Sequence, residues 1–190
     1  SKVESLEIGM SYFPMSLDRF VQTFSLSRSL SSTGGASLSF FNSGVTSIEG
    51  KDLYNNSTGE FDSSEGYIML SFGAKASKKI GMGFNVKIIF NNIDQYTATG
   101  FAGDIGLLYN WSNNMAFSIL LNNIFGKYSW EGLNSESPSF EESLSNINSL
   151  GLKYNFRSIF EKLDIPVDNI IFFTRIDYIK GANIGGFIKV

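Results

Sequence analysis

The stretch that decides the fold runs from Ile80 to Phe90 and reads IGMGFNVKIIF. Alternate positions in it are apolar throughout: Ile80, Met82, Phe84, Val86, Ile88 and Phe90. The positions between them are small or polar except for one isoleucine: Gly81, Gly83, Asn85, Lys87 and Ile89. A period of two predicts a β-strand, and an apolar face backed by a small or polar face is typical of a strand in a transmembrane barrel. A helix would instead scatter the apolar residues around its axis and contain two glycines.

The same alternation recurs along the chain with less regularity. We expect strands at residues 5–13, 19–30, 35–49, 65–76, 79–91, 98–111, 114–126, 147–157 and 167–179, with a further piece at 183–190. Most of them exceed the ordinary strand of about 5–6 residues and match the roughly 9–11 residues that a tilted strand needs to cross a bilayer. No apolar run approaches the roughly 20 residues of a membrane helix.

These observations predict an all-β chain. It would be an antiparallel, up-and-down transmembrane β-barrel in a single domain over residues 1–190. About nine or ten strands are present, and because bacterial single-chain barrels have even strand numbers we expect the barrel to be incomplete.

The expected connections differ in length. Short ones fall at residues 31–34, 77–78 and 112–113, and long polar ones at residues 50–64, 92–97 and 127–146. Outer-membrane barrels have short periplasmic turns and longer outer loops, so this contrast predicts that the short turns face the periplasm, although residues 158–166 depart from it. The longest connection, 127–146, is either a docking surface or a plain surface loop.

Composition narrows the possible functions. Charged residues make up 17% of the chain, below the usual quarter or so, and the net charge is −3. The chain has no histidine and no cysteine, which removes the commonest general base and metal ligand as well as thiolate chemistry. We therefore expect no enzyme, no cofactor, no metal site and no nucleic-acid partner. The acidic loop between Glu49 and Asp62 lacks the spacing of a calcium-binding EF-hand loop.

Aromatic residues gather near the expected strand ends. Tyrosine and tryptophan favour the membrane–water interface, where one end of the side chain is apolar and the other is wet. The expected interface residues are Tyr12, Tyr109, Trp111, Tyr128, Trp130, Tyr154 and Tyr178. The alternative is that these rings close the ends of a soluble core.

Charged residues near the middle of strands are the candidate binding residues. A lysine or arginine facing lipid at mid-depth costs roughly 2–4 kcal/mol, so such residues must face the lumen or one another. Lys87 and Asp104 lie on strands that we expect to be neighbours. The remaining candidates are Lys153, Arg157, Arg175 and Asp177. They would either form ion pairs that fill the barrel or contact a ligand.

Between Gly44 and Trp130 the chain resembles the PorV/PorQ family of outer-membrane barrels, which is related to the FadL fatty-acid transporters. The resembling segments are GVTSIEG at 44–50, TGEF at 58–61, IMLSFGAK at 68–75, GFNVK at 83–87, TGFAGDIGLLY at 99–109 and LNNIFG at 121–126. The family implies a barrel of about fourteen strands, within the range of outer-membrane barrels. It also implies an N-terminal Asn-Pro-Ala segment, which this chain lacks, so we expect a fragment or a smaller relative.

The resemblance implies a location in the bacterial outer membrane and a role in transport, or in protein secretion and cargo docking. The expected partners are the lipid bilayer together with secreted protein cargo or a hydrophobic small molecule. Two alternatives stand beside it: a structural or adhesive surface barrel, and a soluble antiparallel barrel or sandwich that binds an apolar ligand.

Overall fold

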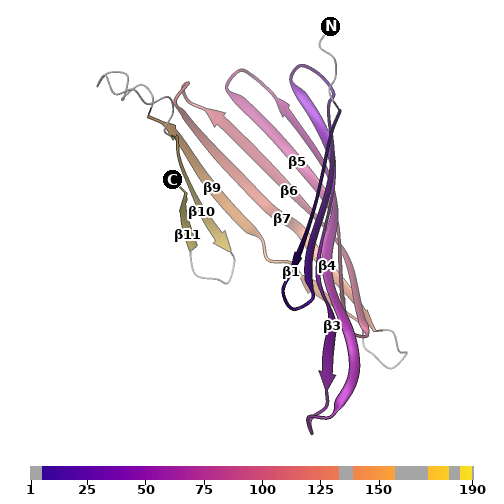
Figure 1. Ribbon diagram of the computed structural model, residues 1–190. Helices are drawn as coiled ribbons and strands as arrows, with labels where there is room; N and C mark the ends of the chain where they lie inside the picture. Colours follow the sequence, from indigo (N-terminus) through magenta and orange to yellow (C-terminus); the bar gives the residue numbers. More distant parts are fainter. Residues whose placement is uncertain (1–5, 133–138, 157–170, 180–184, 190) are drawn as a thin grey trace.

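The computed structural model describes residues 6–132, 139–156, 171–179 and 185–189, which form a single antiparallel sheet (Figure 1). The strands are β1 (Leu6–Met15), β2 (Arg19–Ser29), β3 (Gly34–Lys51), β4 (Ser57–Lys75), β5 (Ile80–Ile93), β6 (Tyr96–Asn110), β7 (Met115–Gly132), β8 (Phe140–Ser143), β9 (Ile147–Asn155), β10 (Ile171–Ile179) and β11 (Gly185–Lys189). Each pairs with the next along the chain up to β8, which is a short addition to β7; β9 pairs with β7 instead of β8, and β10 and β11 follow it in order. The prediction of an all-β, antiparallel, up-and-down sheet is confirmed. In the described part of the chain, no helix is long and apolar enough to cross a membrane.

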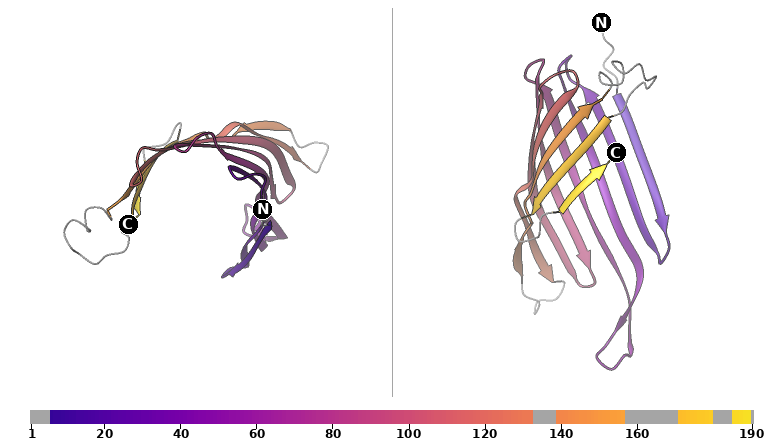
Figure 2. Two further views of the ribbon diagram at one scale, coloured as in Figure 1. Left: turned by 90° about the horizontal axis from the view of Figure 1, so that it is seen from above. Right: turned by 90° about the vertical axis from the view of Figure 1, so that its left-hand side faces the viewer.

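The sheet is curved and open. Seen from above, it is an arc with β1 at one edge and β10 and β11 at the other (Figure 2), and β1 does not pair with β11. An edge strand carries a row of unpaired backbone N–H and C=O groups. The described residues therefore have the shape of part of a barrel wall, and they form one layer rather than the two packed sheets of a sandwich.

The convex face is apolar. Strand pairing aligns its side chains in continuous rows from β1 to β6. One row is Ile8, Leu26, Leu38, Leu70, Val86 and Gly103, and the next is Met10, Phe24, Phe40, Ile68, Ile88 and Phe101. Met10 is the most exposed of these residues, with an exposed fraction of 81%, whereas Leu26 and Phe40 are half-buried. This face has no protein layer to cover it among the described residues.

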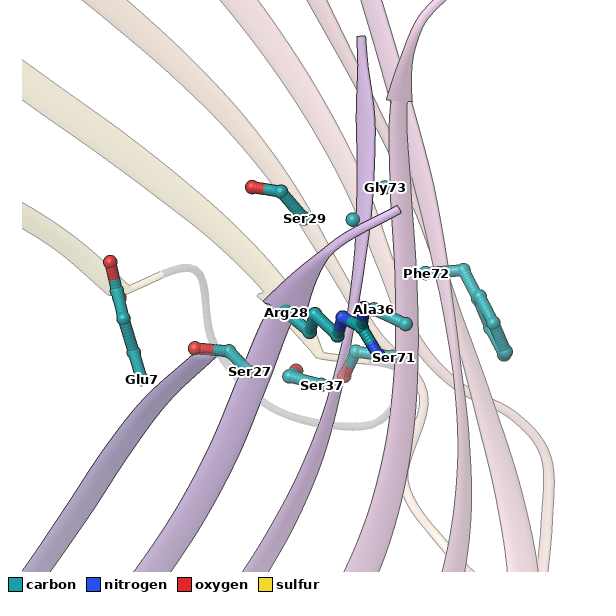
Figure 3. A pocket seen from close by; sticks show the side chains of 10 residues that line it. Glu7, Ser27, Arg28, Ser29, Ala36, Ser37, Ser71, Phe72 and Gly73 are labelled. Atoms are coloured by element: carbon teal, nitrogen blue, oxygen red, sulfur yellow. The ribbon is translucent and has the colours of Figure 1, made fainter. Parts of the chain in front are cut away.

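The concave face is small and polar. Two of its rows over the same strands are Glu7, Ser27, Ser37, Ser71, Asn85 and Asp104, and Gly9, Ser25, Ser39, Met69, Lys87 and Ala102. The row after these is mixed: Ser11, Thr23, Phe41, Tyr67, Ile89 and Gly100. Figure 3 shows Glu7, Ser27 and Ser29 projecting to the concave side, and Phe72 projecting to the opposite side. Among the described residues, the buried hydrophobic ones are Ile89, Ala98, Ala102 and Ala116. The arrangement is the reverse of a water-soluble domain, whose large apolar side chains lie inside.

Two of the expected long loops, residues 50–64 and 92–97, are mostly β-strand with a short turn between. β3 continues to Lys51 and β4 begins at Ser57, and only Asp94 and Gln95 separate β5 from β6. In the third, β7 extends to Gly132 and pairs with β8. The ladder is made by backbone groups, so it continues where the side chains become polar. The expected contrast in loop length is therefore wrong at the β3–β4 and β5–β6 hairpins, and the orientation inferred from it is no longer supported.

Two glycines on the concave face offer a matched test of the packing between β6 and β7. A Cβ on Gly100 would overlap the carbonyl oxygen of Lys127, whereas a Cβ on Gly73 would come no closer than 3.9 Å to the carbonyl oxygen of Met82. We expect Gly100→Ala to lower the free energy of unfolding by about 1–3 kcal/mol, the usual cost of overpacking, and Gly73→Ala to change it little. Urea unfolding followed by tryptophan fluorescence measures both. Equal losses would contradict the close approach at Gly100.

Candidate functional site

An ion pair lies at the centre of the concave face. Lys87 projects from β5 and Asp104 from β6, and the lysine Nζ is 2.7 Å from Oδ1 of the carboxylate. Their side chains are 13% and 6% exposed. Asn85, which is opposite Asp104 in the ladder, shares a face with Lys87 because the two are separated by one residue. Of the two alternatives that the sequence left open for Lys87 and Asp104, the structure shows the ion pair.

The pair sits in a network that satisfies the carboxylate. The Asn85 side chain donates from Nδ2 to Asp104 Oδ2 at 2.9 Å, and the backbone N–H of Asn123 donates to Oδ1 at 3.0 Å. Lys87 also donates to the side-chain oxygen of Asn123 at 2.8 Å. A buried ion pair is favourable only when its remaining donors and acceptors find partners, and these contacts supply them.

Asn123 owes its position to a β-bulge that the sequence analysis missed. In the β6–β7 ladder, Gly103 pairs with Ile124 and Ile105 with Leu121, so Asn122 and Asn123 together lie opposite Asp104. Asn123 has a φ of 56°, a left-handed conformation that asparagine tolerates better than most residues. Its side-chain Nδ2 donates to the carbonyl oxygen of Ser145 at 3.1 Å, which ties the segment before β9 to the network. The sequence feature that could have indicated this bulge is the pair Asn122–Asn123 inside an otherwise apolar strand.

A second charged group lies on β9 and β10. Arg175 Nε is 2.6 Å from Asp177 Oδ1, and the register places Arg175 opposite Gly151 and Asp177 opposite Ser149. Lys153 follows Gly151 on the same face of β9. This group borders a cavity of about 650 Å³. Leu108 and Leu120 form part of its apolar wall, and its polar wall includes Ser118, Ser149, Lys153, Arg175 and Asp177. The cavity therefore combines charged and apolar walls.

The structure thus places five of the six predicted charged residues, in two groups. Lys87 and Asp104 form one, and Lys153, Arg175 and Asp177 the other, with β7 between them in the strand order. Arg157 lies outside the described residues. In the part of the chain that the structure describes, no group of three or more histidine, cysteine or acidic side chains could hold a metal ion.

The predicted interface aromatics divide between the two faces. Four of them lie on the convex face near strand ends: Tyr12, Tyr109, Tyr154 and Tyr178. Tyr109, for example, lies opposite Ile80 of the convex face. Tyr178 lies opposite Asn148, which in turn lies opposite Leu121 of that face. Trp111 follows β6 directly and lies 6.2 Å from Tyr109, edge to face.

Tyr128 and Trp130 do not belong to this convex set. They lie opposite Gly100 and Ala98, on the concave face. Trp130 stacks on Phe140 of β8 with ring centroids 5.9 Å apart, and its Nε1 donates to Glu142 at 2.9 Å. Each of the two bulges in β7 reverses the alternation once, so together they restore it. Tyr128 and Trp130 therefore lie on the face opposite to Phe117, Ile119 and Leu121, as a period-two count along β7 also gives.

Comparison with known proteins adds no name to this geometry. No protein-family model, curated protein or solved structure matches the chain. The resemblance to the PorV/PorQ family stays a prediction.

Proposed function

We propose that this chain forms part of the wall of an outer-membrane β-barrel that serves transport or protein secretion at that membrane. The observation that carries the proposal is the opposition of the two faces. Two rows of mostly large apolar side chains run along the convex face from β1 to β6, and two rows rich in serine, with asparagine and charged side chains, run along the concave face.

The exposed apolar surface supports a bilayer as the surrounding medium. Soluble monomers rarely expose continuous apolar patches larger than a few hundred Å², whereas acyl chains would cover these rows without cost. Arg28 shares the convex face near the end of β2, where a long side chain reaches the headgroup region. The open edges at β1 and β11 need strand partners in that medium, because each unpaired backbone group in a bilayer core costs several kcal/mol. Further strands would close the barrel.

The concave face would then line the lumen. Its hydroxyl and amide side chains suit a water-filled interior. The cavity between β6 and β10 has an apolar side and a charged side with two cations and one carboxylate, which suits an amphipathic anion or a segment of secreted cargo. This arrangement favours a transport or secretion role over a barrel that only displays loops.

The proposal is tested in two steps with the full-length protein. After fractionation of the cells that produce it, we expect the protein in the outer membrane, resistant to carbonate extraction, with a folded band that shifts on heating before electrophoresis. A monodisperse protein that needs no detergent would overturn the proposal. Swelling of vesicles that contain the protein then separates the roles. Passage of small solutes supports transport, and no passage together with co-purified cargo supports secretion.

A further inference from the structure

The β3–β4 hairpin extends well beyond the ends of the neighbouring strands (Figure 1). Its ladder continues past the pair Val45–Ser63 to the pair Lys51–Ser57, which leaves only residues 52–56 as the turn. The hairpin therefore projects along the strand direction, away from the region where the apolar rows lie.

Specific contacts hold the base of this hairpin. A bulge lies between Val45 and Ile48, and within it Ser47, with a φ of 55°, donates its backbone N–H to Asp62 Oδ1 at 3.0 Å. The N–H of Thr46 donates to the carbonyl oxygen of Asp18 in the neighbouring β1–β2 turn at 3.0 Å. The bulge and these bonds fix the direction in which the hairpin leaves the sheet.

The tip is organised by one carboxylate. Asp52 Oδ1 accepts the backbone N–H groups of Tyr54 and Asn56, each at 2.8 Å, and Oδ2 accepts from the Asn56 side chain at 3.0 Å. These hydrogen bonds, of which the one from the Asn56 side chain has the largest effect, lower the pKa of Asp52 from its ordinary value, so the carboxylate stays charged to a lower pH than an ordinary aspartate. The turn presents Leu53 and Tyr54 to solvent, with exposed fractions of 101% and 86%.

The arms behind the tip are acidic. Glu49 and Glu60 lie directly opposite each other in the ladder, and like charges in that position are destabilising. Lys51 Nζ is 3.7 Å from Glu49 and offsets one of the two charges. Asp52 and Asp62 add further negative charge along the same hairpin. A cation supplied from outside would relieve this repulsion.

We propose that the tip of the β3–β4 hairpin docks onto a second protein, one that offers an apolar pocket to Leu53 and Tyr54 and a rim of lysine or arginine to Glu49 and Glu60. Large apolar and aromatic side chains on a pre-organised turn lose little conformational freedom on binding and act as anchors. An anionic membrane surface is the competing occupant, but it would repel the acidic arms. This docking does not require the barrel to be a transporter.

The test uses the full-length protein in the cells that make it, with p-benzoylphenylalanine at position 54. We expect ultraviolet light to link it to one discrete protein, which is identified and purified. The double variant Leu53→Ser and Tyr54→Ser should bind that protein about tenfold more weakly, or weaker still. Glu49→Lys combined with Glu60→Lys should also weaken it, and added salt should slow association with the wild type. Asp52→Ala should weaken binding although it leaves both anchors in place.

The matched control is Leu17→Ser, because Leu17 is 78% exposed in the neighbouring β1–β2 turn; this variant should bind like the wild type. An unchanged heat-shifted band shows that each variant is folded. Links to lipid alone, no discrete linked protein, or equal binding by the wild type and the Leu53–Tyr54 double variant would each overturn the proposal. Outer-membrane localisation is scored separately, so its failure is distinguishable from failure of the docking.

Discussion

Replacing Lys87 by methionine is expected to lower the free energy of unfolding by about 3–5 kcal/mol, the usual cost of leaving one member of a buried ion pair alone. The Asp104 side chain is only 6% exposed, so water cannot replace the lysine. Asn85 and the backbone of Asn123 would still donate to the carboxylate, but neither carries a charge. The measurement is urea unfolding of the protein refolded into phosphocholine vesicles, followed by tryptophan fluorescence.

Two companion variants make this result specific. Lys75→Met removes an exposed lysine from β4, next to β5, and should change the unfolding free energy little. Adding Asp104→Asn to Lys87→Met should recover much of the loss, because an asparagine carries no charge and can still accept from the Asn123 N–H. If the single and double variants lost the same amount, the pair would contribute packing rather than charge compensation.

The strands and their faces could be predicted because a period of two records which side of a strand meets apolar surroundings. The stretch Ile80–Phe90 predicted almost all of β5, which ends at Ile93. The pairing of Lys87 with Asp104 followed, since adjacent antiparallel strands bring mid-strand residues of one face together. These inferences depend only on local alternation and on neighbouring strands pairing in chain order.

The β3–β4 hairpin could not be predicted in the same way. Beyond Val45 the side chains no longer alternate in polarity, although the backbone ladder continues to Lys51. The bulge at Asn123 was missed for a related reason. A bulge adds a residue without a period of its own, and the carboxylate that accepts the freed N–H comes from another strand. Both features depend on backbone geometry that a period-two alternation does not encode.

An arginine on the convex face of β4 should lower the free energy of unfolding much more than an arginine on its concave face. Leu70 lies in a convex row and is 43% exposed, and the next residue, Ser71, lies in a concave row between Ser37 and Asn85. If the convex face meets acyl chains, Leu70→Arg should lower the unfolding free energy in vesicles by about 2–4 kcal/mol, the cost of a cation at mid-depth. Ser71→Arg should cost far less, because its guanidinium would reach a polar lumen.

The comparison isolates the surrounding medium, because the two variants differ by one position and introduce the same side chain. In water, Leu70→Arg would replace an already exposed leucine and would be nearly neutral, while Ser71→Arg would crowd the concave face near Asn85. Urea unfolding in phosphocholine vesicles therefore gives opposite orders of stability for a bilayer-facing and a water-facing convex surface. A Leu70→Arg protein as stable as the wild type would remove the bilayer from the convex face, and with it the basis for assigning this sheet to a membrane barrel.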